Sequence, residues 1–174
     1  METQPALLIL ARAGLPGAML RGLLEARPEP AAALEAARHG AGLRLPAEGL
    51  MALRHPDPAR LEADLAWLSA PGRHLLGWQD PDYPALLRRA PNPPALLFVA
   101  GDPGLLWHPQ IAIVGSRRPS AGGRERAHRF AAAFARAGWA VTSGLAEGID
   151  AAAHAGAMSA GRTVAVVGTG PDLC

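Results

Sequence analysis

Three continuous apolar runs in the C-terminal part of the chain predict the strands of one parallel sheet. The runs IAIVG, WAVTSG and TVAVVGTG occupy residues 111–115, 139–144 and 163–170. They are rich in valine and do not alternate with polar residues, which is typical of parallel strands buried on both faces. The segments between them, 121–138 and 149–161, have helix-like sequences, so each pair of runs forms a β-α-β unit. The pattern predicts an α/β fold with a Rossmann-like parallel sheet.

Short helices are predicted over the first part of the chain. Apolar residues on both sides of the turn at 14–17 favour two helices, and residues 31–39 and 58–70 favour two more. We therefore expect a small all-helical domain at 1–69, followed by the α/β domain at 70–174. The turn also has the glycines of a helix-hairpin-helix element that can hold a DNA backbone, but an ordinary helix–helix turn is the plainer interpretation.

The segment between these two patterns, residues 71–109, is rich in proline. It contains two tryptophans and a tyrosine, which makes it too apolar for a free tether. LLFVA at 96–100 is its one strand-like run. We expect this run to be an extra strand that begins the α/β domain.

The end of each predicted parallel strand combines glycine with a hydroxyl side chain. The three ends are Gly115-Ser116-Arg117, Ser143-Gly144 and Gly168-Thr169-Gly170. Carboxyl ends of parallel strands meet at one edge of a sheet, where ligands bind in such folds. Glycine lets a phosphate approach the main-chain amides, the hydroxyl donates a hydrogen bond, and the following helix offers its positive end. We therefore expect one anion-binding edge, at which Arg117 can grip a phosphate in two places.

The charge distribution agrees with an anionic ligand. Residues 111–174 carry seven arginines against four acidic residues, and five of these arginines, at positions 117, 118, 124, 126 and 129, fall around one predicted loop and helix. Such a cluster suits phosphate or nucleic acid, although a solvated helix face is the commoner explanation. All seventeen basic residues are arginine, which matches a GC-rich coding bias and argues nothing about function by itself.

Several other classes of site are excluded by the sequence. The loop GSRRPSAGG is not the G-x-G-x-x-G of a dinucleotide site, and a chain without lysine has no P-loop. Cys174 is the only cysteine, so we expect no disulfide and no cysteine-based metal site. No run approaches a membrane span, and the N-terminus lacks the pattern of a signal peptide. We expect a soluble, cytoplasmic protein without cofactor or metal and without membrane contact.

Asp150 and His154 form the one pair that could carry chemistry. They stand four residues apart on a predicted helix, where they could be two metal ligands or an acid–base pair. No third ligand and no nucleophile accompany them at a recognisable spacing. The plainer interpretation is that Asp150 caps the helix start and His154 packs nearby, so we expect no catalytic site.

A family resemblance rests on three segments that occur in order and at the right spacing. IAIVGSRRPSAGGRERA, VTSGLAEGIDAAAHAGA and GRTVAVVGTGPD together resemble the DNA-processing protein A (DprA/Smf) family. The resemblance covers residues 60–174 closely, and the helical front end is similar to the SAM-like domain of that family more loosely. It implies a protein that binds single-stranded DNA and helps to load the RecA recombinase on incoming DNA during natural transformation.

The resemblance also implies which residues hold the DNA. The family's phosphate grip falls on Gly115, Ser116 and Arg117, and the small residues at 143–144 are then expected to lie against the sugar-phosphate backbone. A basic residue before the third strand, commonly lysine in relatives, falls on Arg162, which keeps the charge but changes the geometry. We expect both guanidinium groups to reach the same edge of the sheet.

One position departs from the family pattern. Glu147 stands where relatives often have arginine. Its charge repels DNA locally, which leaves direct contact by this loop open.

The sequence ends just after the third predicted strand. We therefore expect a sheet that is incomplete at the C-terminus, and interpret the chain as a fragment or truncated product of a longer protein. The dimer and recombinase contacts of the family involve the later half of the domain. The oligomeric state of this chain stays open, with a monomer as one alternative.

The sequence leaves two other interpretations of the function open. Rossmann-like phosphoribohydrolases of the lysine-decarboxylase-like group use similar small-residue strand ends. They carry a PGG-x-GT-x-x-E signature that this chain lacks. A chain with an incomplete fold could also be inert.

Overall fold

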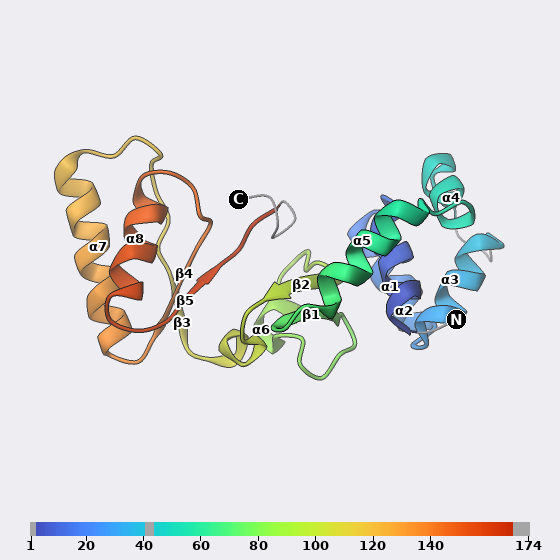
Figure 1. Cartoon of the computed structure of the whole chain (residues 1–174), viewed down its shortest axis with the longest axis horizontal. Helices are drawn as coiled ribbons and strands as arrows, with labels where there is room; N and C mark the ends of the chain where they lie inside the picture. The colour runs from blue at the N-terminus through green and yellow to red at the C-terminus, as the bar shows by residue number, and fades with distance from the viewer. Residues whose placement is uncertain (1–2, 41–43, 169–174) are drawn as a thin grey trace. The chain divides into compact units, whose positions relative to one another are not determined.

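The computed structural model describes residues 3–40 and 44–168. The chain divides into two compact units, Met1–Asp102 and Pro103–Cys174, which are described separately (Figure 1).

Helices form the first part of the first unit. They are α1 Thr3–Arg12, α2 Gly17–Ala26, α3 Pro30–Arg38, α4 Ala47–Arg54 and α5 Pro58–Ser69. Two of them begin with proline at the first helical position, where its missing N–H is not needed. The carboxylates of Glu29 and Asp57 each accept hydrogen bonds from two amides of the following turn. The predicted helices are present, and α4 is an additional helix that the pattern did not predict.

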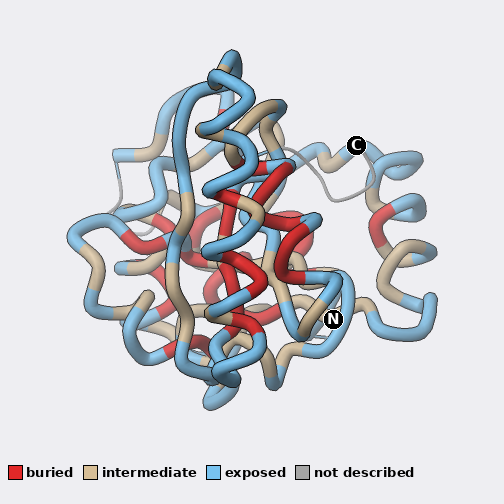
Figure 2. The backbone as a smooth tube through the Cα atoms, turned by 90° about the vertical axis from the view of Figure 1, so that its left-hand side faces the viewer, coloured by how far each residue is buried: buried red, intermediate tan, exposed pale blue. Residues whose placement is uncertain are grey.

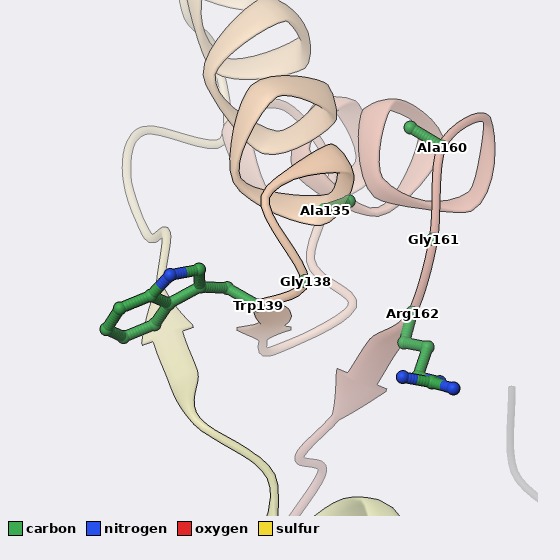
Figure 3. Close-up of a pocket in the computed structure, with 6 residues that line it drawn as sticks. All are labelled: Ala135, Gly138, Trp139, Ala160, Gly161 and Arg162. Carbon is green, nitrogen blue, oxygen red and sulfur yellow. The ribbon is translucent and has the colours of Figure 1, made fainter.

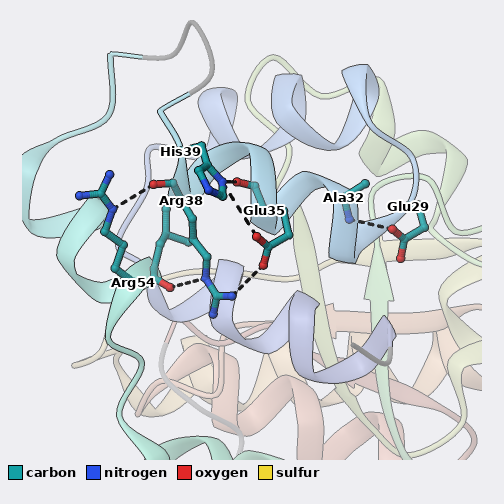
Figure 4. A network of polar contacts seen from close by, with 7 residues as sticks. Glu29, Ala32, Glu35, Arg38, His39 and Arg54 are labelled. Carbon is teal, nitrogen blue, oxygen red and sulfur yellow. Dashed lines mark hydrogen bonds and ion pairs between the residues drawn. The ribbon is translucent and has the colours of Figure 1, made fainter.

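A core of leucine and alanine holds these helices together. Its fully buried members include Ala6, Leu10, Ala33, Leu34, Ala37 and Leu53. Polar contacts reinforce it: Arg12 binds the buried carboxylate of Asp64 with two hydrogen bonds, from Nε at 2.8 Å and Nη2 at 2.5 Å, which joins α1 to α5. Arg38 donates to the carbonyl of Leu53, and Arg54 donates back to the carbonyl of Arg38, which joins α3 to α4 (Figure 4).

A two-stranded antiparallel sheet completes the first unit. β1 Arg73–Gly77 pairs with β2 Leu96–Ala100, and the short helix α6 Ala85–Arg88 lies between them in sequence. The prediction that residues 96–100 begin the α/β domain is therefore wrong, because this strand pairs with β1 and lies in the first unit. The sheet belongs with the helices: the rings of Trp67 and Phe98 meet edge-to-face with centroids 6.0 Å apart.

The division between the units falls at Asp102, whereas the sequence predicted a domain boundary between residues 69 and 70. Residues 70–102 pack with the helices because the hairpin segment shares their core. Ala95 is a buried member of that core. Arg73 also lies over the ring of Trp67, with its guanidinium carbon 4.9 Å from the ring centroid.

The second unit has two layers, a parallel sheet and a pair of helices on one of its faces. It contains the 3-10 helix η1 Pro103–Trp107, the strands β3 Gln110–Ala112, β4 Ala140–Ser143 and β5 Thr163–Ala165, and the helices α7 Ala121–Arg136 and α8 Ile149–Met158. The strands are parallel, in the order β3-β4-β5, with Ile111 beside Val141 and Val141 beside Thr163. This confirms the predicted α/β class with a Rossmann-like parallel sheet, although each strand is shorter than its apolar run.

Small residues let α7 and α8 pack closely against each other and against one face of the sheet. Ala131 and Ala135 of α7 meet Ala153 and Ala157 of α8, and Val141 lies beneath them. Along α7, buried and exposed positions alternate with the helical period (Figure 2).

The outer strands β3 and β5 are only partly covered in the part of the chain that the structure describes, and Val114 and Val166, just beyond them, are 72% and 63% exposed. The central strand β4 has no exposed residue. The prediction of strands buried on both faces is therefore correct for β4 and wrong for the two outer strands. No helix within the described residues has both the length and the apolar content that a membrane span requires.

Candidate nucleic-acid interface

The ends of the three parallel strands lie together at the carboxyl edge of the sheet. Ser143, at the end of β4, contacts both of its neighbours. Its hydroxyl donates to the carbonyl of Ile113 at 2.7 Å, just beyond β3, and its carbonyl accepts from the amide of Val166 at 2.9 Å, just beyond β5. The sheet topology thus places the first residues of three loops side by side.

Glycine at the start of α8 makes room for the loop that follows β3. Gly148 has a φ of +90°, and a Cβ at this position would lie 2.3 Å from the carbonyl oxygen of Ser116 and 2.7 Å from that of Arg117. The amide of Ile149 donates to the same Ser116 carbonyl at 3.1 Å. Gly115 has the same constraint, since its Cβ would lie 2.8 Å from the Ile149 side chain. The residues between β4 and α8 are small because the loop after β3 lies against them.

Ser143 and Gly144 were expected to donate to phosphate, and the structure corrects this expectation. Ser143 is 3% exposed, and its one hydroxyl proton is used by the carbonyl of Ile113. The amide of Gly144 donates to Oδ2 of Asp150 at 3.1 Å. Both donors therefore have partners inside the protein. Asp150 lies in the first turn of α8 but accepts from this loop amide, while Gly148 occupies the N-cap position predicted for a capping side chain.

His154 belongs to a buried polar group that joins α8 to the first residue of β5. The hydroxyl of Thr163 donates to the carbonyl of Val141 at 2.7 Å, so its oxygen is left to accept a proton from Nδ1 of His154, also at 2.7 Å. Burial lowers the pKa of His154, and the charge of Asp150 and the main chain of Ser143 only partly oppose this. His154 is therefore neutral at pH 7, with a buried Nε2 that has no hydrogen-bond partner among the described residues.

This pair does not form a metal site with other described residues. Within the described ranges, no three histidine, cysteine or carboxylate side chains are grouped so that they could hold a metal ion. Asp150 and His154 instead join the loop after β4 to α8 and β5.

The accessible groups at this edge come mainly from the loop after β3. Ser116, Arg117 and Arg118 are all exposed. Oγ of Ser116 accepts from the amide of Arg118 at 3.0 Å, which leaves the serine hydroxyl proton free to donate. Neither arginine forms a salt bridge with a described residue. Arg118 was predicted to lie in this loop and in the basic cluster, but it was not among the predicted phosphate contacts.

The loop leads directly into α7, whose first turn adds positive potential. Ser120 caps this helix, with Oγ accepting from the amide of Gly123 at 3.1 Å. Amides at a helix start favour anions nearby. Arg124, also exposed and without a salt bridge to a described residue, lies within this first turn. Exposed Glu147, in the loop after β4, is the opposing charge.

Arg162 does not lie at this edge. It directly precedes β5, and its carbonyl accepts from the amide of Val141, which places it at the amino edge of the sheet. There it lines a pocket of about 400 Å³ with Ala135, Gly138, Trp139, Ala160 and Gly161 (Figure 3). Because α7 and α8 both end here, their carbonyl groups make this edge favourable for a cation and unfavourable for a phosphate. The expectation that Arg162 joins Arg117 in one pocket is wrong.

The third predicted strand end is described only in part. Gly168 is exposed beyond β5 and no atom would meet a Cβ there within 4 Å. Thr169 and Gly170, which were also predicted to bind phosphate, lie outside the described residues.

The sequence is similar to a family with a role in DNA recombination. Residues 74–174 match the family described as DNA recombination-mediator protein A. Protein Smf of Synechocystis sp. is 42% identical over 102 residues, which cover 54% of this chain and 25% of that protein. Protein Smf of Escherichia coli is 39% identical over 111 residues, which cover 63% of this chain and 30% of that protein. The matched regions thus span about a quarter to a third of these curated relatives.

A solved structure agrees in fold as well as in sequence. The chain is similar over its whole length to the X-ray structure of DNA processing protein A from Streptococcus pneumoniae, with a TM-score of 0.78 and 29% identity. It covers 61% of that chain. The likeness includes the helical front end, which the family match from residue 74 does not reach.

Proposed function

The chain belongs to the DNA recombination-mediator protein A family, and we propose that it binds single-stranded DNA through the loop after β3 and the start of α7. The observation that carries this proposal is the group of exposed residues Ser116, Arg117 and Arg118 beside the N-terminus of α7. A hydroxyl proton, two guanidinium groups and the helix start all favour the same ligand, a chain of phosphates.

The structure supports a smaller set of contacts than the sequence predicted. Gly115, Ser116 and Arg117 remain proposed phosphate contacts, with Gly168 beside them at the carboxyl edge. Ser143 and Gly144 support this site from beneath, since their donors bind Ile113 and Asp150. A backbone grip of this kind binds without strong preference for base sequence and weakens with salt.

The biological role is proposed from the family. We propose that the whole protein acts in DNA recombination and natural transformation, where it would hand incoming single strands to the RecA recombinase. The support is the family description and the name of a relative from Bacillus subtilis, DNA processing protein DprA, which is 42% identical over 90 residues. Contact with RecA and dimerisation belong to this proposal for the whole protein.

We also propose that the protein works as a binding protein and not as an enzyme, and that it needs no cofactor. The only candidate acid–base pair, Asp150 and His154, is buried, with 6% exposure for each residue, and is engaged by Gly144 and Thr163. A substrate at the carboxyl edge would meet neither side chain in the conformation described.

A competition assay separates DNA binding from a nucleotide site. Fluorescently labelled oligo-dT is bound to the full chain at low salt, and either unlabelled oligo-dT or nucleoside monophosphates are added. We expect displacement by oligo-dT and no displacement by monophosphates, because one phosphate contacts only part of the surface. Displacement by monophosphates at concentrations similar to those of oligo-dT would favour a phosphoribohydrolase-like nucleotide site and reject the proposal.

A further inference from the structure

The proposed phosphate site consists of Ser116, Arg117, Arg118 and the start of α7, and we call it the strand-end site. Further along α7 lie exposed basic and aromatic residues that this site does not include. Arg126, Arg129 and Phe130 are all exposed, whereas the alanines of α7 that pack against α8 are buried. In Figure 1, α8 and the sheet lie on one side of α7. We call these three residues the α7 outer surface.

Phe130 presents an aromatic ring at this surface. It is 59% exposed, and its ring stacks on that of Phe134 with centroids 6.4 Å apart and an angle of 22° between the planes. Phe134 is half-buried and packs against the core of the second unit. A lone exposed phenylalanine needs no explanation. This ring has an aromatic neighbour on one side and stays largely exposed, so it is available to stack with a base.

The charges around this ring are of one sign. Arg126 lies one helical turn before Phe130, and Arg129 is its neighbour in sequence. Neither arginine forms a salt bridge with any residue that the structure describes. Glu125 is the one acidic residue of α7. Surfaces that bind single strands combine basic residues, which contact phosphates, with aromatic rings, on which bases stack.

The α7 outer surface continues the strand-end site. The helix axis advances about 15 Å from Ser120 to Phe130 at roughly 1.5 Å per residue. Unpaired arginines occur along this whole distance, from the loop after β3 to Arg129. We propose that single-stranded DNA bound at the loop after β3 continues along α7, with one base stacked on Phe130 and phosphates beside Arg126 and Arg129. This inference rests on the proposed function and extends the same site.

Strands with and without bases test the stacking directly. The full chain is titrated with dT of about twelve nucleotides and with an abasic strand that has the same number of phosphates. Phe130→Ala is expected to weaken dT binding about fivefold to hundredfold, the range for the loss of one base–aromatic stack. Its affinity for the abasic strand stays unchanged, because no base is there to stack. Phe130→Trp is expected to retain dT binding.

Two further variants control for folding and for general surface effects. Phe130→Leu keeps much of the apolar volume over Phe134 but removes the flat ring, so it is expected to behave like Phe130→Ala. Met158→Ala removes another exposed apolar side chain, 68% exposed on α8, and is expected to leave both affinities unchanged. The double variant Arg126→Gln and Arg129→Gln should reduce the log–log salt slope by about 1.4, at 0.7 for each phosphate contact.

The outcomes distinguish this inference from the proposed function. If Phe130→Ala binds dT like the unaltered chain while Arg117→Ala still reduces the salt slope, DNA stays at the strand ends and the inference is refuted. Equal losses for dT and abasic strands would make Phe130 structural and also refute it. A concentration-dependent mass that Phe130→Ala abolishes would identify a second copy of the chain as the occupant, against the inference. If the unaltered chain binds no oligo-dT, both the proposed function and the inference fail.

Discussion

Replacing Arg117 by alanine is the most direct perturbation of the proposed phosphate-binding site, and Arg162→Ala is its matched control. Both residues are exposed arginines of the second unit next to a parallel strand, but they lie at opposite edges of the sheet. With a strand too short to reach the α7 outer surface, the three arginines at 117, 118 and 124 are available at the carboxyl edge. Three phosphate contacts give a log–log salt slope of about −2, at roughly 0.7 for each contact with a single strand.

Removing one contact changes this slope by a measurable amount. Arg117→Ala should give a slope of about −1.4, so that raising salt from about 50 to about 200 mM costs about sevenfold in affinity instead of about 18-fold. Arg162→Ala should leave the slope unchanged, because its guanidinium lies near the carbonyl ends of α7 and α8. Fluorescence anisotropy at four or more salt concentrations measures the slopes, and thermal denaturation checks that both variants fold. Equal slopes for the unaltered chain and Arg117→Ala, or an equal reduction by Arg162→Ala, would refute the assignment of the phosphate-binding site to the carboxyl edge.

Two predictions concern residues in and next to α8. Gly148→Ala should lower the free energy of unfolding of the second unit by about 1–3 kcal/mol and weaken oligo-dT binding, because the added Cβ would displace the Ser116 carbonyl. Gly122→Ala is the control, since a Cβ there meets only the end of Arg126 at 4.0 Å. Equal stability of the two variants would contradict this explanation. Because burial lowers the pKa of His154, the folded unit binds fewer protons than the unfolded chain below the ordinary histidine pKa of about 6.5. Its contribution to stability is therefore present above about pH 6.5 and is lost as the pH falls toward the lowered pKa. Denaturation midpoints between about pH 8 and pH 5 should show this loss, and His154→Gln should reduce it; a variant with the same pH dependence as the unaltered chain would show that another group is responsible.

The sequence predicted the elements whose signals are local. Continuous apolar runs identified the three parallel strands, and helical spacing identified most helices of the first unit. The run at 96–100 was predicted correctly as a strand, but it lies in the first unit and not in the α/β domain as predicted. Its partner β1 reads RHLLG, with polar residues and no alternation, and the pairing depends on a contact across some twenty intervening residues that periodicity does not report.

The candidate site was predicted in position but not in its internal contacts. Strand polarity brings Gly115, Ser143 and Gly168 to one edge, and the sequence was sufficient for that. It could not show that the Ser143 hydroxyl binds a neighbouring carbonyl, because that choice depends on the distance between two strands. Strand polarity alone places Arg162 at the amino edge, because it directly precedes a parallel strand.

The small residues between β4 and α8 serve the proposed site indirectly. Without a side chain at Gly148, the carbonyl of Ser116 can accept from the first amide of α8, which fixes the loop after β3 from behind. The Gly144 amide is fixed in turn by Asp150 from the same helix turn. A loop held at its main chain has less conformational entropy to lose when its exposed side chains bind DNA. We therefore expect Gly148 and the buried carboxylate of Asp150 to improve binding without touching the ligand. Substitution at Gly148 should affect stability and affinity together, whereas substitution at Arg117 should affect affinity alone.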